Sequence, residues 1–391
     1  MRTVALDLGV KKITFCEVCD GAVIARATVK RFHDLDDRLG ADTPAAVVAF
    51  EACREAWWIH DALKAQGHIP LMIDTTRVRQ LGVGQHGRKT DRLDAEALAH
   101  ALARGSIPTA HVLSPARRQM RAELSTRGAL VQTRAQYVTT VRGLVRSVGG
   151  ELPTCTTEYF ARHMRTANLP TATTTLIDPL LVMLESLSVQ LFAVDTRLET
   201  LARTEPVVAL LATVPGVGLI VACTFVSALD ETGRFRDAHS VEAYLGLVPS
   251  ENSSGGRRRL GAITKQGNPW ARVALVQAAH SILRASPEDD PLRIWAQDVA
   301  ARRGKPIAII ALARRLAGVL WAMWRDHRPY QPHRLAAQSA AGLEQASEET
   351  AERATRLAVA AAEYKIFPRT RLSRKSSRKP AAGPAREVPR R

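Results

Sequence analysis

Residues 84–99 read GQHGRKTDRLDAEALA and contain two aspartates, Asp91 and Asp94, spaced three apart. Behind them apolar residues recur at helical spacing: Leu93, Ala97, Leu98 and Ala101. Residues three apart share one face of a helix, so the two carboxylates point the same way. Such like charges repel unless a cation lies between them, and carboxylate oxygens suit Mg²⁺ or Mn²⁺. The stretch therefore predicts either a metal-binding helix start or an ordinary helix N-terminus, where the dipole favours acids.

The segment before this helix predicts a mixed α/β domain. Alternating or apolar runs favour strands and one helix, in this order: strands over residues 2–10, 13–18, 22–29 and 45–50, a helix over 57–66, and a strand over 69–73. Asp20-Gly21 is typical of a hairpin turn between the second and third strands. Three antiparallel strands thus come first, and a strand–helix–strand–helix succession follows.

Acidic residues stand at the ends of two of these strands. Asp7 lies near the end of the first strand and Glu51 closes the fourth. Taken alone, Asp7 fits a turn residue before Gly9, and Glu51 fits an exposed loop. In a mixed sheet, however, such strand ends converge at one edge, where Asp91 and Asp94 would face them. Four carboxylates in one cleft bind two divalent cations, a recurrent arrangement for phosphodiester cleavage.

Composition indicates a polyanionic partner. The 391 residues are enough for two domains or more, and 55 Lys+Arg against 38 Asp+Glu give a formal charge of +17. Such an excess favours nucleic acid, with a ribosome-like or membrane-surface protein as the competing class. Five scattered cysteines favour a reducing compartment such as the cytoplasm.

The middle of the chain predicts a helical region. Residues 114–146 form a basic helix, either a nucleic-acid-binding face or a solvated one, with arginines at many turns: Arg117, Arg118, Arg121, Arg127, Arg134, Arg142 and Arg146. Residues 154–175 are Thr-rich and predict a linker, after which Asp178 caps a helix with Pro179 at its first position. Leucines and valines at 184–198 alternate three and four apart, which predicts a coiled-coil-like antiparallel pair.

Residues 207–229 carry no charge and are long enough to span a bilayer. The run Pro215-Gly216-Val217-Gly218 interrupts them, which favours two short buried helices joined by a tight turn and no membrane span. This turn is either an ordinary helix break or a helix-hairpin-helix turn, in which exposed amides near Gly216 and Gly218 bind phosphate.

Residues 243–272, AYLGLVPSENSSGGRRRLGAITKQGNPWAR, contain a loop suited to phosphate. Hydroxyls and glycines at 253–256 are followed by Arg257, Arg258, Arg259 and Lys265. A serine in this loop either binds the phosphate or attacks it, and attack requires activation by a base, metal or cation. Asn268 and Pro269 predict the cap and first position of a following helix.

These motifs resemble a known family. The element order and acids resemble a RuvC-like, RNase H-fold nuclease domain. Asp7 in ALDLG, Glu51 in AFEAC and the pair in KTDRLDA resemble the four acids of DEDD transposases of bacterial insertion sequences, which include Piv-type invertases and bridge-RNA-guided recombinases. The GL-x-P, SG and G-x-ITK-x-G-N-x-x-x-R motifs of residues 246–272 resemble the second domain of that family. The resemblance covers residues 1–325.

The resemblance implies an α/β plus all-α chain, with a RuvC-like DEDD nuclease domain over 1–112, a basic helical or coiled-coil region over 113–204, and a transposase domain with a catalytic serine over 205–328. Outside the resemblance, composition predicts an Ala/Arg-rich, partly disordered tail over 329–391. Asp7, Glu51, Asp91 and Asp94 would hold Mg²⁺ or Mn²⁺, and Ser254 would be the nucleophile, with Ser253 as its rival. The expected partners are the DNA of the element ends and target, a structured guide RNA, and further copies in a dimer or tetramer.

The residues expected to contact nucleic acid are Lys89, Arg92, Arg117, Arg118, Arg121, Arg134, Gly216, Gly218, Arg257, Arg258, Arg259, Lys265 and Arg272. Two alternatives to the recombinase stay open. One is a RuvC-like nuclease that hydrolyses DNA with metal ions and water, with Ser254 only binding phosphate. The other is a basic nucleic-acid-binding protein without catalysis.

Overall fold

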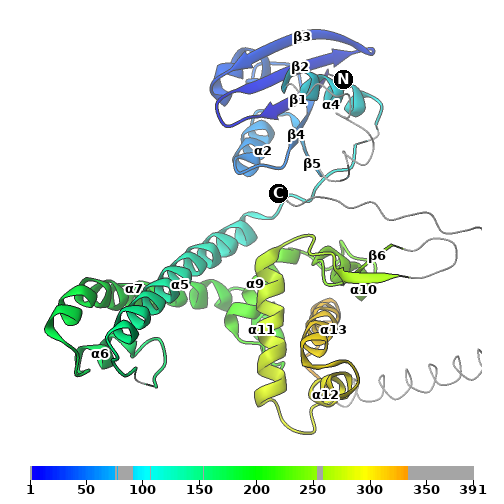
Figure 1. Cartoon of the computed structure of the whole chain (residues 1–391). Helices are drawn as coiled ribbons and strands as arrows, with labels where there is room; N and C mark the ends of the chain where they lie inside the picture. Colours follow the sequence, from blue (N-terminus) through cyan, green and yellow to red (C-terminus); the bar gives the residue numbers. More distant parts are fainter. Residues whose placement is uncertain are drawn as a thin grey trace, which may run out of the picture. The chain divides into compact units, whose positions relative to one another are not determined.

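The computed structural model describes residues 2–74, 77, 91–105, 107–152, 154–252 and 259–332, and within this part it leaves out the side chains of 91–94. The chain divides into two compact units (Figure 1). The first comprises Met1–Leu201 with Val226–Glu231, and the second comprises Ala202–Phe225 with Thr232–Arg391. Each unit is taken by itself below.

The first unit opens with a five-stranded mixed sheet in the order β3-β2-β1-β4-β5. Its strands are β1 (Arg2–Leu8), β2 (Ile13–Cys19), β3 (Ala22–Val29), β4 (Ala46–Glu51) and β5 (Ile69–Ile73). The first three pair antiparallel, whereas β1, β4 and β5 pair parallel. Asp20 and Gly21 both have positive φ, 49° and 80°, as the predicted two-residue hairpin requires.

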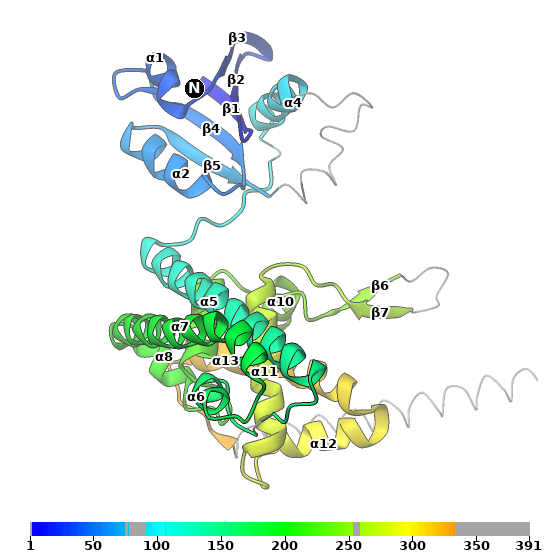
Figure 2. The ribbon, with the colours of Figure 1, turned by 60° about the vertical axis from the view of Figure 1, so that its left-hand side comes forward.

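Alternation along the strands gives the sheet two apolar faces. Val4 and Leu6 of β1 face a core that α2 (Ala56–Ala65), η1 (Phe32–Leu35) and α1 (Asp36–Leu39) complete. Ala5 of β1 faces the other side, where α4 (Asp91–Ala103) packs. Figure 2 shows α2 and α4 on opposite sides of the sheet. A sheet covered on both faces explains why these strands are nearly continuous apolar runs.

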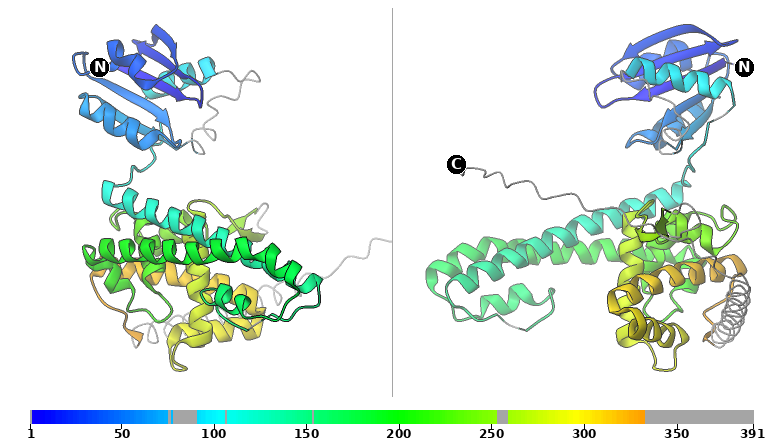
Figure 3. Two further views of the ribbon diagram at one scale, coloured as in Figure 1. Left: turned by 90° about the vertical axis from the view of Figure 1, so that its left-hand side faces the viewer. Right: turned by 45° about the vertical axis from the view of Figure 1, so that its right-hand side comes forward.

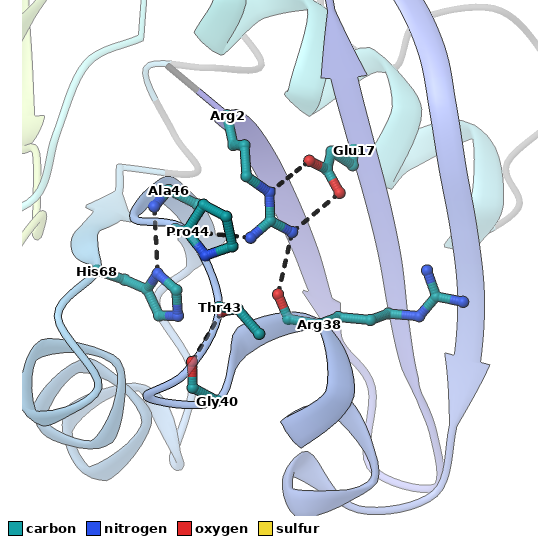
Figure 4. Close-up of polar contacts among 8 residues, drawn as sticks. All are labelled: Arg2, Glu17, Arg38, Gly40, Thr43, Pro44, Ala46 and His68. Atoms are coloured by element: carbon teal, nitrogen blue, oxygen red, sulfur yellow. Dashed lines mark hydrogen bonds and ion pairs between the residues drawn. The ribbon is translucent and has the colours of Figure 1, made fainter.

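A polar network at the start of β1 fixes how β4 enters the sheet (Figure 4). Arg2 donates to both oxygens of Glu17, at 2.7 and 3.1 Å, and to the carbonyls of Pro44 and Arg38. His68 bridges the backbone N–H of Ala46, 3.2 Å away, and the carbonyl of Leu39, 2.8 Å away. The segment leading into β4 is thereby held at both sides, which sets the register of β4 against β1.

A long antiparallel helical pair follows, formed by α5 (Pro115–Ser147) and α7 (Thr171–Arg203), with α6 (Phe160–Arg165) between them in the chain (Figure 3). Val141 and Val145 of α5 share one core with Ile177 and Leu181 of α7. At the other end of the pair, the Arg127 guanidinium lies 2.6 Å from the Asp195 carboxylate. The predicted antiparallel pair and its apolar seam are therefore confirmed.

The predicted linker over 154–175 and the predicted helix start at Asp178 are wrong. The linker region contains α6, and α7 already begins at Thr171, so that Pro179 lies inside the helix. Thr173 and Ile177 are buried in the helical pair, and burying them extends the helix N-terminally past the local capping signal. An interior proline costs a helix roughly 3 kcal/mol, so tertiary packing outweighs local preference here.

The second unit is mostly helical around α13. Its elements are α8 (Pro206–Leu211), α9 (Leu219–Leu229), α10 (Ala238–Tyr244), β6 (Pro249–Glu251), β7 (Leu260–Ile263), α11 (Pro269–Ala285), α12 (Pro291–Arg303) and α13 (Lys305–Asp326). α8 and α9 are the two predicted short helices, and residues 226–229 of α9 group with the first unit. Among the described helices, α7 and α13 are long and apolar enough to cross a membrane, but 61% of the apolar window of α13 is buried inside the protein.

Asp230 anchors the segment that leads into α5. It is 5% exposed, has a φ of 66°, and belongs to the first unit with the groups it binds. Its carboxylate accepts hydrogen bonds from the Ser114 N–H (N···O 3.0 Å) and the Ser114 hydroxyl (O···O 2.7 Å). His111 Nε2 lies 2.6 Å from the same carboxylate. Burial raises the pKa of Asp230, but the hydrogen bonds from Ser114 and His111 outweigh burial and lower the pKa overall.

We expect Asp230→Asn to lower the free energy of unfolding by about 2 kcal/mol at pH 7, because an amide accepts fewer of these bonds. The folded pKa lies below the unfolded value of about 3.9. The stabilisation is therefore complete above that value and is lost as the pH falls through the folded pKa. Thermal unfolding from pH 7 to pH 3 should show a smaller loss for the variant than for the wild type.

The matched control is Asp289→Asn at an exposed acid of the second unit. Its melting temperature should follow that of the wild type at every pH. Equal melting temperatures for Asp230→Asn and Asp289→Asn would contradict an anchoring role for Asp230.

Candidate active site

Asp7 and Glu51 lie side by side on neighbouring parallel strands. The register pairs Ala5 with Ala49 and Leu6 with Phe50, so Asp7 and Glu51 come next at the carboxyl ends of β1 and β4. Backbones of neighbouring strands are about 4.8 Å apart. Ala5 and Ala49 belong to the apolar cluster under α4, and residues two further along each strand share that face. Asp7 is half-buried and Glu51 is exposed, so both carboxylates stand where the sheet meets solvent.

The helix that carries the other two acids packs on the same face. α4 begins at Asp91, and its residues Ala95, Leu98 and Ala99 belong to one cluster with Ala5 and Ala49. Arg26 of β3 fixes the helix from across the sheet, with 2.6 Å between its guanidinium and the Glu96 carboxylate. The side chains of Asp91, Arg92 and Asp94 lie outside the described residues, as does Lys89.

This donor set fits a divalent cation. Two carboxylates stand at adjacent strand ends, and a helix that starts with two further aspartates covers the same face. Oxygen donors of this kind match hard cations such as Mg²⁺ and Mn²⁺. Among the side chains that the structure describes, no three metal-binding groups meet at one point, since two of the four predicted ligands fall outside that set.

Residues 243–272 contain a β-hairpin in the second unit. The base of this hairpin is the place where residues 244–246 and 266–267 approach each other. β6 and β7 pair antiparallel, and the Asn252 N–H donates to the Arg259 carbonyl at 3.0 Å, closing the loop between them. Ser253, Ser254, Arg257 and Arg258 lie in that loop and outside the described residues. Arg259 and Lys265 are exposed at the two ends of β7.

Two glycines bring the base of the hairpin together. Gly246 has a φ of 68°, and a Cβ there would come within 2.3 Å of the Gln266 carbonyl oxygen. Gly267 has a φ of 70°, and a Cβ there would come within 2.0 Å of the Tyr244 carbonyl oxygen. Side chains are thus excluded at both positions, which explains the glycines of the GL-x-P and TK-x-G-N motifs.

Arg272 holds this base from α11. Its Nη1 atom donates to the carbonyls of Leu245 (3.2 Å), Gln266 (2.5 Å) and Gly267 (3.3 Å). Burial of the guanidinium lowers the pKa of Arg272. Asn268 caps α11 through the N–H groups of Trp270 and Ala271, as predicted. Arg272 was expected at nucleic acid, and the structure places its guanidinium on the carbonyls that carry the hairpin.

The arginines expected along α5 are engaged within the first unit. Arg118 lies 2.6 Å from the Asp61 carboxylate, and both Arg118 and Arg121 lie over the Trp57 ring at 5.7 and 5.6 Å. Arg134 lies 3.3 Å from Glu158. Arg117 is mostly buried, with Nε 3.9 Å from Asp230. Sequence periodicity alone did not identify these carboxylate and aromatic partners, because they lie far away along the chain.

The glycines of the α8–α9 turn have different surroundings. Gly216 has a φ of 84°, and a Cβ there would come within 2.8 Å of Ile282 in α11. Gly218 has open space around it and lies just before α9. Its carbonyl accepts a hydrogen bond from the Ala222 N–H in the first turn of that helix. Gly216 therefore serves close packing against α11, whereas Gly218 has room for a side chain; both glycines are exposed.

Comparison with known proteins accords with this geometry. The model described as the transposase IS116/IS110/IS902 family matches residues 208–292, and that of the DEDD transposase domain of IS110 elements matches residues 4–149. A probable family 20 transposase of Pseudomonas aeruginosa is 28% identical over 79% of this chain and 92% of its own length. The transposase of element IS1111A of Coxiella burnetii is 23% identical over 85% and 92%. That of element IS1328 of Yersinia enterocolitica is 26% identical over 82% and 96%.

The mixed sheet with its acid pair and these matches define a transposase, an enzyme that cuts and rejoins DNA. A DEDD domain of this class depends on divalent metal ions. Both matching models describe transposases of insertion sequences, and they cover residues 4–149 and 208–292 of this chain.

We expect Gly267→Ala to lower the melting temperature of the second unit by several degrees. The added Cβ meets backbone at the base of the hairpin, and the positive φ strains any other L residue. Gly233→Ala is the matched control, because a Cβ there has open space around it. Differential scanning calorimetry of the two variants checks this, and an unchanged melting curve for Gly267→Ala would contradict the tight base.

Proposed function

We propose that this transposase joins itself to DNA through Ser254 while the acids of the first unit bind Mg²⁺. The observation that carries the proposal is the parallel register that sets Asp7 beside Glu51 on the face where α4 begins with Asp91 and Asp94. A divalent cation bound by these acids supplies positive charge that polarises the scissile phosphate and favours ionisation of an attacking hydroxyl.

The reaction balances without an external energy source. The Ser254 oxygen forms a bond to phosphorus, its proton passes to solvent or a nearby base, and the bond from phosphorus to one deoxyribose oxygen breaks. The serine ester keeps the energy of the cleaved phosphodiester. A hydroxyl of the partner DNA end then attacks the same phosphorus and releases the serine, so cutting and rejoining need no cofactor that carries energy.

The hairpin supports this role because its base is held by close backbone contacts and exposed cations lie near its loop. Gly246, Gly267 and Arg272 hold the two strands together. Arg259 and Lys265 are exposed beside the loop, where Arg257 and Arg258 add charge in the sequence. Cations at such positions stabilise charge that develops on phosphate oxygens.

The remaining partners follow from charge and from the resemblance of the motifs. The DNA of element ends and target is the substrate, and a structured RNA encoded by the element selects both DNAs. Lys89, Arg92, Arg121 and Gly218 are proposed nucleic-acid contacts. The acids and the serine belong to different parts of the sequence and must meet in space, within one chain or between copies, and the proposed assembly is a dimer or tetramer. The proposed location is the bacterial cytoplasm, at the nucleoid.

A second candidate is a RuvC-like nuclease that hydrolyses DNA without a covalent intermediate. The acid pair at the ends of β1 and β4 is compatible with it, since two-metal sites also activate water. In that reaction Ser254 binds phosphate and is not consumed. The two candidates differ in whether DNA becomes attached to protein.

We expect Asp7→Asn and Glu51→Gln each to reduce Mg²⁺- or Mn²⁺-dependent strand cleavage at least about 100-fold, because a neutral amide is a much poorer ligand for a hard cation. The control Glu55→Gln changes an exposed acid four residues further on and should cleave as the wild type does. Titration with Mn²⁺ by calorimetry should show weakened binding for Asp7→Asn. Undiminished cleavage by both acid variants would refute the metal site.

We expect a protein–DNA adduct on a denaturing gel when the wild type meets Mg²⁺, the element ends and the flanking RNA. Ser254→Ala and Asp94→Ala should abolish the adduct, whereas Ser253→Ala should keep it. Adduct loss with Ser253→Ala alone would transfer the nucleophile to Ser253. Cleavage that proceeds without an adduct and is insensitive to Ser254→Ala would establish the hydrolytic nuclease instead.

A further inference from the structure

A groove of about 630 Å³ runs along α13 in the second unit, at a place that the proposed reaction does not use. α10 borders it on one side and Trp295 of α12 on the other, and residues 328–331 close its end. Sites that enclose small ligands have about 300–1,000 Å³. The groove therefore has the size of a binding site and exceeds an ordinary packing defect.

The floor of the groove is apolar. Ala311 and Ala322 lie half-buried along the lining face of α13, and Gly318 between them is buried. α10 approaches closely here, since a Cβ on Gly318 would lie 3.1 Å from the Cβ of Ala238.

The walls are cationic and aromatic. Arg315 lies over the Trp295 ring at 4.8 Å, and burial lowers the pKa of Arg315, so this charge sits in partly dehydrated surroundings. Arg314 lies 2.5 Å from Glu242, and Arg328 is exposed at the end of the groove. The lining acids are engaged, Glu242 by Arg314 and Asp326 by Arg325 at 2.7 Å, so positive charge prevails.

The end wall is anchored to the rest of the unit. The Tyr330 hydroxyl donates to Asp290 at 3.0 Å, and the Tyr330 N–H donates to the Thr213 hydroxyl at 3.0 Å. Burial and Asp290 raise the pKa of the Tyr330 phenol, so its ring stays neutral beside the arginines. The groove is consequently preformed, and a ligand would enter it without first ordering this segment.

We propose that this groove binds an unpaired nucleotide of a single-stranded nucleic acid, with the base on the α13 floor and the phosphate at Arg328 and Arg315. An apolar floor of small residues, beside an aromatic ring and several guanidinium groups, matches the base and the phosphate of a nucleotide. A duplex keeps its bases stacked and paired, so it presents only phosphates here. The groove therefore prefers single strands, in RNA or DNA, and the inference stands independently of Ser254 and the four acids.

Binding is measured on the full chain in EDTA, so that no cleavage occurs and failure of the catalytic proposal leaves this test intact. Fluorescence anisotropy compares labelled oligouridine, oligothymidine and a DNA duplex of equal length. Ala322→Phe fills the floor and should weaken single-strand binding at least about tenfold, as loss of one stacked base does. Arg328→Gln should weaken it about threefold to tenfold by removing one phosphate contact.

The matched control is Arg284→Gln, an exposed arginine of α11 that does not line the groove. It should leave single-strand binding within about twofold of the wild type, because it removes the same charge elsewhere. Duplex binding should change little in Ala322→Phe, since the floor takes only an unstacked base. Melting curves verify that each variant is folded.

Photocrosslinking identifies which residues contact the bound nucleotide base. Oligonucleotides with 5-iodouridine or 5-iododeoxyuridine should crosslink to Trp295 or Tyr330, and the more efficient of the two identifies RNA or DNA as the source. Crosslinks confined to other parts of the chain, or Ala322→Phe binding single strands as tightly as the wild type, would overturn the proposal. If Ala322→Phe misfolds, the charge pair Arg328→Gln and Arg284→Gln decides, and equal effects of these two overturn it.

Discussion

The parallel register of β1 against β4 is the constraint on which the candidate active site depends. A shift by one residue would turn Glu51 to the opposite face of the sheet from Asp7. The register is held far from the acids, where Arg2 joins Glu17 to the carbonyl of Pro44 and His68 fixes the N–H of Ala46. Charged and polar groups at one end of the strands thus determine the geometry of carboxylates at the other end.

The second unit uses the same principle with different groups. There the Arg272 guanidinium donates hydrogen bonds to three backbone carbonyls. Gly246 and Gly267 allow the backbone segments to approach each other. β6 and β7 extend from this base as a short antiparallel pair, and Arg259 and Lys265 are exposed at the two ends of β7. A loop whose two ends are held by such a base loses less conformational entropy on binding a ligand than a loop whose ends are free.

Most of the first sheet was predictable because local signals and tertiary packing agree there. Strand alternation, the Asp20-Gly21 turn and the acids at strand ends are each visible within a window of a few residues. Prediction failed at residues 171–179, where burial of Ile177 against α5 prolongs a helix through Pro179. Packing between segments far apart in sequence decides such cases, and no local pattern contains it. The same reason hid the partners of Arg118 and Arg272.

These partners change what the net charge of +17 means for nucleic-acid binding. Arg118 lies at Asp61, Arg127 at Asp195 and Arg134 at Glu158, so these arginines stabilise the fold and the net excess comes from other cations. A guanidinium held by a carboxylate attracts phosphate less than an exposed one, since the pair is nearly neutral at a distance. Arginines therefore mark a nucleic-acid surface only where their local acids are already engaged and a receptive shape lies beside them. The groove along α13 meets both conditions through Arg315, Arg328 and its small-residue floor.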